Sequence, residues 1–313
     1  MRKSLPPQTT EWLNPPANVK TPYTFFEGSA HHPLGPDDSA FNLGNAWWFM
    51  DAALLTYSSE AAIRGAFNTA GITGDVTFFP GAHSTQAYVI SMPGAIVLAF
   101  RGTQVDSFWP SVIDFAVDAQ FLPVPDGHGG WVHGGFLGAI NEVWPEIATH
   151  LRAEQKLAQR PLWITGHSLG AGLATLAASR TCDDEAFGLQ GVYTYGSPRV
   201  GDPDFCRRIR VPAFRFRNDS DLVAHLPLGL VFRHVGTSQF IDAAGHLHRD
   251  LPEPIELMFE PGAHVLSARE AITLEGFLRT SGPELPIPGF LADHAPINYS
   301  ILIWNCFDAT HAQ

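Results

Sequence analysis

Residues 161–178 read PLWITGHSLGAGLATLAA, an apolar run, a serine flanked by glycines, and a second apolar run. The first run favours a buried strand and the second favours a helix. Gly166 and Gly170 leave room for a sharp turn between them, on which Ser168 would project its hydroxyl out of a sheet. The first N–H groups of the helix would then face any negative charge forming beside that hydroxyl. The pattern predicts a nucleophile elbow, although a serine that merely caps a helix in a glycine-rich turn fits it equally well.

Strand-like and helical segments alternate on both sides of this turn. We expect helices over 42–57, 60–69, 142–158, 268–278 and 296–304, from apolar residues at helical spacing. We expect strands over 76–79, 87–92, 95–100, 191–195 and 213–217, and a late pair over 231–235 and 239–241. This alternation predicts an α/β fold with a mostly parallel central sheet flanked by helices on both faces.

The first 40 residues are rich in proline, asparagine, threonine and glycine and show little periodicity. We expect residues 1–40 to form an extended N-terminal arm, held against the body by Trp12, Tyr23, Phe25 and Phe26. No repeat or linker interrupts the rest of the sequence, so we expect a single domain over 41–313.

The net charge of −12 disfavours nucleic acid and anionic membrane surfaces as partners. No stretch approaches the ~20 apolar residues that a membrane span needs, so no transmembrane segment is expected. Met1-Arg2-Lys3 carries the charge of a signal peptide, but prolines follow where the apolar region should be. The expectation is a soluble protein, cytoplasmic or secreted without a recognisable N-terminal signal peptide.

Cofactor signals are missing from the sequence. It contains no glycine-rich dinucleotide motif and no P-loop lysine motif, so no nucleotide cofactor is expected. The histidine pairs 31–32 and 246/248 lack the carboxylate or cysteine spacing of a metal site, and no metal is expected. Cys182, Cys206 and Cys306 are odd in number and widely spaced, so we expect free or buried thiols with at most one disulfide, whose pairing stays open.

A serine nucleophile requires a base, and the base requires an anion that orients it. The predicted strand 213–217 runs directly into Asn218-Asp219-Ser220-Asp221, so Asp219 or Asp221 lies at the carboxyl end of a strand. In α/β-hydrolase folds the acid follows the serine and the histidine comes last. Candidate bases in that position are His225, His234, His246, His248, His264 and His294.

Six sequence blocks in order resemble the class 3 lipases, the family of the filamentous-fungal triacylglycerol lipases. They cover roughly residues 85–305 and read AFRGT (99–103), VHGGFL (132–137), ITGHSLGA (164–171), YGSPRVGD (195–202), NDSDLVAHLP (218–227) and Asp293-His294 with Tyr299 following. The resemblance implies an α/β-hydrolase fold and hydrolysis of carboxylic esters. Residues 1–40 match nothing in the family's pattern.

The resemblance also assigns roles to individual residues. It implies Ser168 as the nucleophile and His294 as the general base. The family's acid lies in an N-x-x-D-x-V pattern, which selects Asp221 over Asp219. Thr103 and the backbone N–H of Leu169 match the family's oxyanion hole.

The segment after Thr103 has apolar residues at helical spacing with polar residues between them. An amphipathic helix at this place resembles the lid of these lipases, which covers the site and opens at a lipid surface. A helix facing the core, or a strand that begins near Phe115, is the alternative. The residues on the apolar face of the expected lid are Val105, Phe108, Trp109, Val112 and Ile113.

We therefore predict a carboxylic ester hydrolase, most simply a triacylglycerol lipase that works through an acyl-enzyme intermediate. The alternatives are a short-chain or feruloyl-type esterase, a phospholipase, and an acyltransferase that uses the same intermediate. A non-catalytic binding protein on the same fold is disfavoured, because binding alone requires no serine, acid and histidine in this order. The expected partner is a lipid or a small ester, at a lipid–water interface in the case of a lipase, and the sequence leaves the oligomeric state open.

Overall fold

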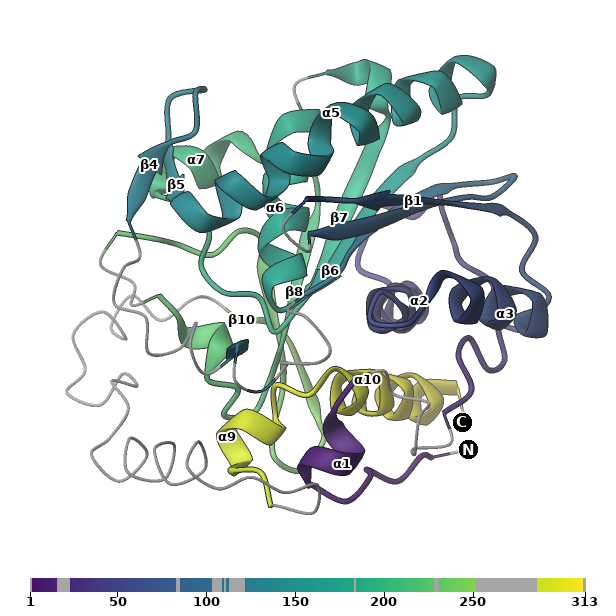
Figure 1. Ribbon diagram of the computed structural model, residues 1–313. Helices are drawn as coiled ribbons and strands as arrows, with labels where there is room; N and C mark the ends of the chain where they lie inside the picture. Colours follow the sequence, from purple (N-terminus) through teal and green to yellow (C-terminus); the bar gives the residue numbers. More distant parts are fainter. Residues whose placement is uncertain are drawn as a thin grey trace.

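An eight-stranded sheet runs through the computed structural model, with helices on both faces (Figure 1). The structure describes residues 2–15, 23–82, 85–102, 109, 111–112, 122–182, 184–227, 231–251 and 286–311. The strands of the sheet, in spatial order, are β1 (Asp75–Pro80), β2 (Gln86–Ser91), β3 (Ile96–Phe100), β6 (Leu162–His167), β7 (Leu189–Tyr195), β8 (Ala213–Asn218), β9 (Thr237–Ile241) and β10 (Leu247–Leu251).

The central strands β3, β6, β7, β8 and β9 are parallel to one another. At one side of the sheet β1 and β2 pair antiparallel, with β2 also antiparallel to β3, and at the other edge β10 pairs antiparallel with β9. Because parallel strands end at the same edge of a sheet, the loops that follow β6, β7 and β8 come together there. These loops contain Ser168, Gly196 and Asp221.

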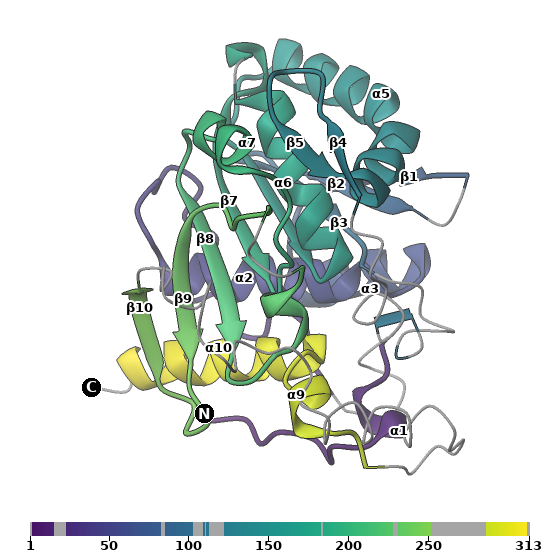
Figure 2. The ribbon, with the colours of Figure 1, turned by 90° about the vertical axis from the view of Figure 1, so that its left-hand side faces the viewer.

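Two layers of helices enclose the sheet (Figures 1 and 2). One face is covered by α2 (Leu43–Leu55) and α10 (Pro296–His311), and the other by α5 (Gly134–Leu157) and α6 (Leu169–Thr181). The smaller helices are α1 (Thr10–Leu13), α3 (Glu60–Ala70), α7 (Pro203–Arg208), α9 (Gly289–Ala292) and the 3₁₀ turns η2 (Glu185–Phe187) and η3 (Val223–His225). The sheet is therefore the middle of three layers.

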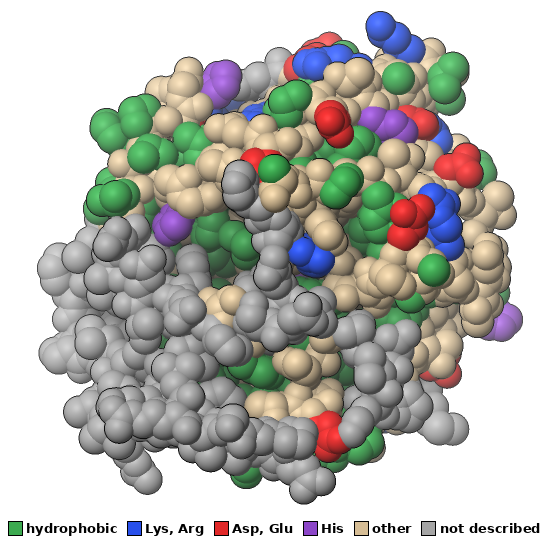
Figure 3. Space-filling view, viewed as in Figure 1, with side chains coloured by type: hydrophobic (Ala, Val, Ile, Leu, Met, Phe, Trp, Pro, Cys, Tyr) green, Lys and Arg blue, Asp and Glu red, His purple; other side chains and the backbone are tan. Residues whose placement is uncertain are grey.

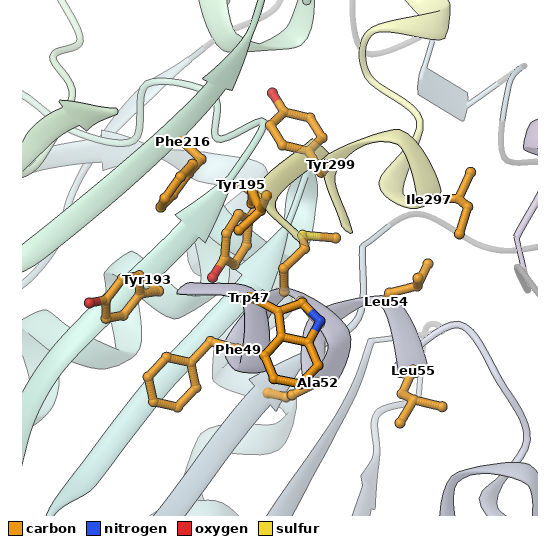
Figure 4. Packing of buried hydrophobic residues seen from close by; sticks show 14 of the residues in the cluster. Trp47, Phe49, Ala52, Leu54, Leu55, Tyr193, Tyr195, Phe216, Ile297 and Tyr299 are labelled. Carbon is orange, nitrogen blue, oxygen red and sulfur yellow. The ribbon is translucent and has the colours of Figure 1, made fainter. Parts of the chain in front are cut away.

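The alternation of side chains along a strand divides the interior into two apolar cores. In β3, Val97 and Ala99 face the core beneath α2 and α10, whereas Leu98 and Phe100 face the core beneath α5 and α6. Helix α2 is buried from Asn45 to Leu55 because it lies between the sheet and α10. In Figure 4, Trp47 and Phe49 of α2 lie among Tyr193 and Tyr195 of β7, Phe216 of β8 and Tyr299 of α10.

A short hairpin, β4 (Pro123–Pro125) with β5 (Trp131–His133), stands apart from the main sheet. Hydrophobic side chains gather on the surface in this region, at the upper left of Figure 3. Leu122, which precedes β4, and Trp131, the first residue of β5, are 64% and 49% exposed. The hairpin therefore presents apolar surface to the solvent.

The predicted α/β architecture, with a mostly parallel sheet between helices, is confirmed. The strand predicted over 231–235 is wrong, because residue 233 makes only an isolated bridge to Gly201. Gly236 turns the chain immediately afterwards with φ +79°, so the late strand is β9, which begins at Thr237 and pairs with β8. The helix predicted from residue 142 begins earlier, at Gly134, where the His133 side chain caps it. The helix predicted over 268–278 lies outside the described residues.

The N-terminal residues lie against the body, as expected for an arm. Tyr23, Phe25 and Phe26 are buried, and Leu13 of α1 is an additional buried anchor that the sequence analysis did not identify, while Trp12 is only half-buried. The backbone N–H of Lys3 donates to Asn305 Oδ1 in α10 at 2.7 Å, so the two ends of the chain lie side by side (Figure 1). We keep the division into an arm over 1–40 and one domain over 41–313 as a proposal.

Candidate active site

Ser168 occupies a strained turn between β6, which ends at His167, and α6, which begins at Leu169. Its backbone has φ 59° and ψ −129°, a conformation that residues with a Cβ rarely adopt. A Cβ on Gly166 would lie 2.2 Å from the carbonyl oxygen of Gly170, and one on Gly170 would lie 2.3 Å from that of Phe100. Both glycines are therefore required for this turn, whose strand–turn–helix geometry is the one expected of a nucleophile elbow.

The structure brings together the three residues expected to form a triad. Ser168 Oγ lies 2.8 Å from His294 Nε2. His294 Nδ1 lies 2.9 Å and 3.0 Å from the two carboxylate oxygens of Asp221. All three side chains are buried, and His294 and Asp221 are 0% exposed. A serine, a histidine and a carboxylate on three separate loops thus form one continuous hydrogen-bonded path.

The carboxylate of Asp221 is held by several donors. Tyr299 Oη donates to Oδ2 at 2.6 Å, and the backbone N–H of Val223 donates to Oδ1 at 2.9 Å. Burial opposes ionisation, but the charge and hydrogen bond of His294 and the hydrogen bond from Tyr299 outweigh it and lower the pKa of Asp221. The carboxylate is therefore ionised at neutral pH and accepts hydrogen bonds only.

Asp219, the alternative acid, lies elsewhere. Its backbone has φ +30°, and its carboxylate accepts a hydrogen bond from the hydroxyl of its neighbour Ser220. Of the other candidate bases, His234 Nε2 donates to the carbonyl of Ala224, and His248 donates to Asp242. His264 lies outside the described residues.

Two residues of the site were not assigned a role from the sequence. Tyr299 donates to Asp221 and accepts from the backbone N–H of Asn218 at 2.9 Å, so it fixes the acid loop. Gly196 has φ +54°, and a Cβ there would lie 2.8 Å from Asp221 Oδ2 and 2.9 Å from His294 Nδ1. The sequence contained a signal for both residues, since each belongs to a block shared with the lipases, but a block does not reveal what a residue contacts.

The expected oxyanion and lid residues are only partly described. Leu169 opens α6, so its N–H belongs to the first helical turn, whose N–H groups have no acceptor within the helix. Thr103, Val105, Phe108 and Ile113 lie outside the described residues. Trp109 and Val112 are helical and only 3% and 1% exposed. The lid therefore stays a prediction.

Within the described part of the chain, no cluster of three or more His, Cys, Asp or Glu side chains is placed to hold a metal ion. All three cysteines are free thiols, and burial raises the pKa of Cys206 to about 12. No helix in the described ranges has both the length and the apolar character to cross a membrane.

Residues 97–230, which include the elbow and the acid loop, match the sequence profile of the family described as lipase (class 3). This match covers less than half of the chain, so it shows a likeness to the class 3 lipases over that segment. The chain is similar to a lipase of Rhizomucor miehei, with 36% identity over 157 residues, and to the secreted mono- and diacylglycerol lipase A of Penicillium cyclopium, with 34% identity over 155 residues. Each alignment covers 47% of this chain, and they cover 41% and 48% of the two relatives, so the chain spans about half the length of the curated relatives it matches.

A solved structure extends this likeness beyond the aligned segment. The structure of a fungal lipase–inhibitor complex, described as a model for interfacial activation in lipases, superposes with a TM-score of 0.58 and 26% identity. The superposition covers 72% of this chain and 91% of that one. The α/β-hydrolase fold of the class 3 lipases therefore extends over most of the chain.

Proposed function

We propose that this protein is a class 3 lipase that hydrolyses carboxylic esters, with triacylglycerols as its principal substrates, through a covalent acyl-enzyme. One observation carries the proposal, namely the hydrogen-bonded path from Ser168 through His294 to Asp221 on a strained elbow. A serine that merely capped a helix would need neither the histidine nor the buried carboxylate. We assign Ser168 as nucleophile, His294 as general base and Asp221 as the orienting acid.

The protonation of His294 follows from its neighbours. The Asp221 carboxylate can only accept, so Nδ1 of His294 carries the proton that bonds to it. In the neutral ring Nε2 is then unprotonated and accepts the proton of the Ser168 hydroxyl. Oγ attacks the ester carbonyl carbon as this proton moves to Nε2, and Asp221 stabilises the imidazolium that forms.

The negative charge that develops on the carbonyl oxygen requires hydrogen-bond donors. Leu169 N–H at the start of α6 supplies one, and we propose that Thr103 supplies the other. The carbon–oxygen bond to the alcohol then breaks, and the alcohol leaves with the proton from His294. Water next gives a proton to His294 and attacks the acyl carbon, after which Ser168 recovers its proton and the fatty acid leaves.

We further propose that the enzyme acts at a lipid–water interface. The apolar residues at helical spacing over 105–113 support a lid over the site. The exposed Leu122 and Trp131 provide apolar surface of the kind that contacts lipid. The names of the relatives, a lipase and a secreted mono- and diacylglycerol lipase, favour acylglycerols and export from the cell.

The test compares the native chain with Ser168→Ala on p-nitrophenyl esters from acetate to palmitate and on emulsified triolein. Ser179→Ala is the matched control, because Ser179 is a buried serine on the same helix α6 and bonds to Arg208. We expect hydrolysis that extends to long chains and rises at the emulsion surface, that is lost in Ser168→Ala, and that persists in Ser179→Ala.

Other outcomes contradict defined parts of the proposal. Hydrolysis confined to short or aromatic esters would mean an esterase, and residues 105–113 would then be a structural segment and not a lid. Preference for phospholipid over triolein would mean a phospholipase. If neither protein hydrolyses any ester, the catalytic proposal fails and a binding protein on a hydrolase fold remains.

A further inference from the structure

His167, the residue before the nucleophile, is 0% exposed and lies between two groups that the proposed reaction does not use. Its Nδ1 lies 2.9 Å from the hydroxyl of Tyr57, which follows α2. Its Nε2 lies 2.9 Å from the backbone carbonyl oxygen of His294. The elbow is thus joined to the main chain of the base independently of the contact between Ser168 and the His294 ring.

The partners of His167 define its protonation. A carbonyl oxygen only accepts, so Nε2 must carry the proton that bonds to His294. Burial, together with the nearby charge of His294, lowers the pKa of His167 well below its usual range, so the ring is neutral and Nδ1 is bare. The Tyr57 hydroxyl therefore donates to Nδ1. Both ring nitrogens are satisfied, in one tautomer.

The His294 carbonyl, which accepts the hydrogen bond from His167, lies just before helix α10. The hydrogen bonds of α10 begin one residue later, where Ala295 O accepts from the N–H groups of Asn298 and Tyr299. The His294 carbonyl precedes these helical hydrogen bonds. Its donor is therefore His167, a residue outside the helix, which fixes the position of this carbonyl. A backbone shift at this point would move the imidazole away from Ser168, and misplacement by about 1 Å can cost on the order of 100-fold in rate.

We propose that His167, held in one tautomer by Tyr57, is a positioning residue that fixes the main chain of His294 so that its ring reaches Ser168. This proposal rests on the proposed function, because it assigns His294 as the base.

The electrostatic surroundings of His167 agree with this role. Its ring centroid lies 4.7 Å from that of His294 and 5.7 Å from that of Tyr299. The other titratable groups that influence the pair are Asp221 and, beside Tyr57, Arg101. A charged His167 would repel the imidazolium that forms on His294, whereas the neutral ring does not oppose it.

Tyr57 also contacts the chain that leads to the expected oxyanion residue. A Cβ on Gly102 would lie 2.1 Å from Tyr57 Oη and 2.8 Å from the carbonyl oxygen of His167. Gly102 directly precedes Thr103 in the sequence. The Tyr57 hydroxyl therefore packs against both His167 and Gly102.

The kinetic test measures kcat and KM on p-nitrophenyl butyrate, with the thermal midpoint of each variant. His167→Leu removes the donor, whereas His167→Gln keeps an N–H at the reach of Nε2. Tyr57→Phe removes the hydroxyl, and Tyr88→Phe is its matched control, because Tyr88 is a buried tyrosine that donates to Ala52 of the same helix α2.

We expect kcat to fall about 30-fold in His167→Leu with KM within about twofold, because the main chain of His294 loses the donor that fixes it and the imidazole moves relative to Ser168. His167→Gln should recover kcat to within about fivefold of the native value, and Tyr57→Phe should lower kcat about fivefold. Tyr88→Phe should leave kcat unchanged. Equal kcat in His167→Leu and His167→Gln, or a native kcat in a folded His167→Leu, would overturn the proposal.

A measurement without substrate separates this proposal from the proposed function. Nitrogen-15 NMR of histidine-labelled native protein, with His167→Gln to assign the signals, reports which nitrogen carries the proton. We expect a neutral His167 ring protonated on Nε2 at neutral pH. An Nδ1-protonated or charged ring would overturn the positioning proposal even in an active enzyme, whereas the expected tautomer in a protein without esterase activity would locate the failure in the proposed function.

Discussion

At the scale of single residues, the geometry of the site requires glycine at three positions, because a Cβ atom would not fit there. Gly166, Gly170 and Gly196 each occupy a point where a Cβ would meet a backbone or catalytic atom at less than 3.0 Å. The sequence predicted the first two through the elbow pattern. It could not predict the third, because the neighbours of Gly196 come from loops 25 and 98 residues further along the chain.

Gly196→Ala should abolish most of the activity while the protein stays folded. The new methyl group would press on Asp221 and His294, and the φ of +54° adds strain, so we expect kcat/KM to fall at least about 100-fold. Gly71→Ala is the matched control, because Gly71 also has positive φ (+68°) but nothing lies within 4 Å of its Cβ position. Similar losses of kcat/KM in the two variants would contradict this account of Gly196.

Asp293 makes stability depend on pH. Burial, followed by the charges of Asp219 and Asp221, raises the pKa of Asp293 from 3.8 to about 7, against the hydrogen bond from Ser220. Between these two values the unfolded chain loses the proton while the folded chain keeps it, so the protonated group stabilises the fold below about pH 4. This stabilisation is lost as the pH rises through about 7.

Asp293→Asn should remove this dependence, because the amide keeps an acceptor for Ser220 without a charge. We expect its melting temperature to equal that of the native protein near pH 4 and to exceed it by a few degrees near about pH 8. Asp75→Asn, at an exposed position, should show no such difference. A native-like melting curve for Asp293→Asn at both pH values would contradict the raised pKa.

At the scale of elements, the N-terminal arm and two helices share one buried carboxylate. Asp51 of α2 accepts from Tyr23 Oη at 2.6 Å, from Phe26 N–H at 2.6 Å and from the hydroxyl of Ser300 in α10. The apolar spacing of α2 predicted the helix but not this junction, since a polar residue in a helical pattern is ordinarily assigned to the solvent face. The arm is thus bonded to the body as well as packed on it.

Asp51→Ala should lower the free energy of unfolding by about 3 kcal/mol, because three buried donors lose their acceptor together. Asp38→Ala is the control, an exposed aspartate before α2 whose loss should cost less than about 0.5 kcal/mol. Urea unfolding of both variants measures the difference. If the two variants unfold at the same urea concentration, Asp51 does not join the arm to the helices energetically.

At the scale of the whole molecule, the alternation of strands and helices predicted the layers and most of the strand positions. It failed at residues 231–235, where an apolar run forms no strand because Gly236 turns the chain before it can pair. The predicted start of α5 is eight residues too late. The glycines in its first turns disfavour a helix in the sequence pattern, although His133 caps the helix there. Local patterns predict elements well where burial sets the period, and less well where a turn or a cap sets the end.

The order of serine, acid and histidine along the chain was predictable, and the choice between Asp219 and Asp221 required the family pattern. The structure separates these two carboxylates by geometry, since only Asp221 bonds to His294. The shared sequence blocks contain His167 and Tyr299 but do not reveal their contacts. Tyr57, His167 and Tyr299 come together only when the end of α2 packs against β6 and α10.

The central claim is that Ser168 is a nucleophile activated by His294. Its most direct test is the reaction of the native chain with a p-nitrophenyl alkylphosphonate, followed by peptide mass spectrometry. We predict release of one p-nitrophenolate per chain, a phosphonyl adduct on Ser168, and loss of both in Ser168→Ala and His294→Ala. No adduct, or an adduct on another residue that persists in Ser168→Ala, would contradict the account.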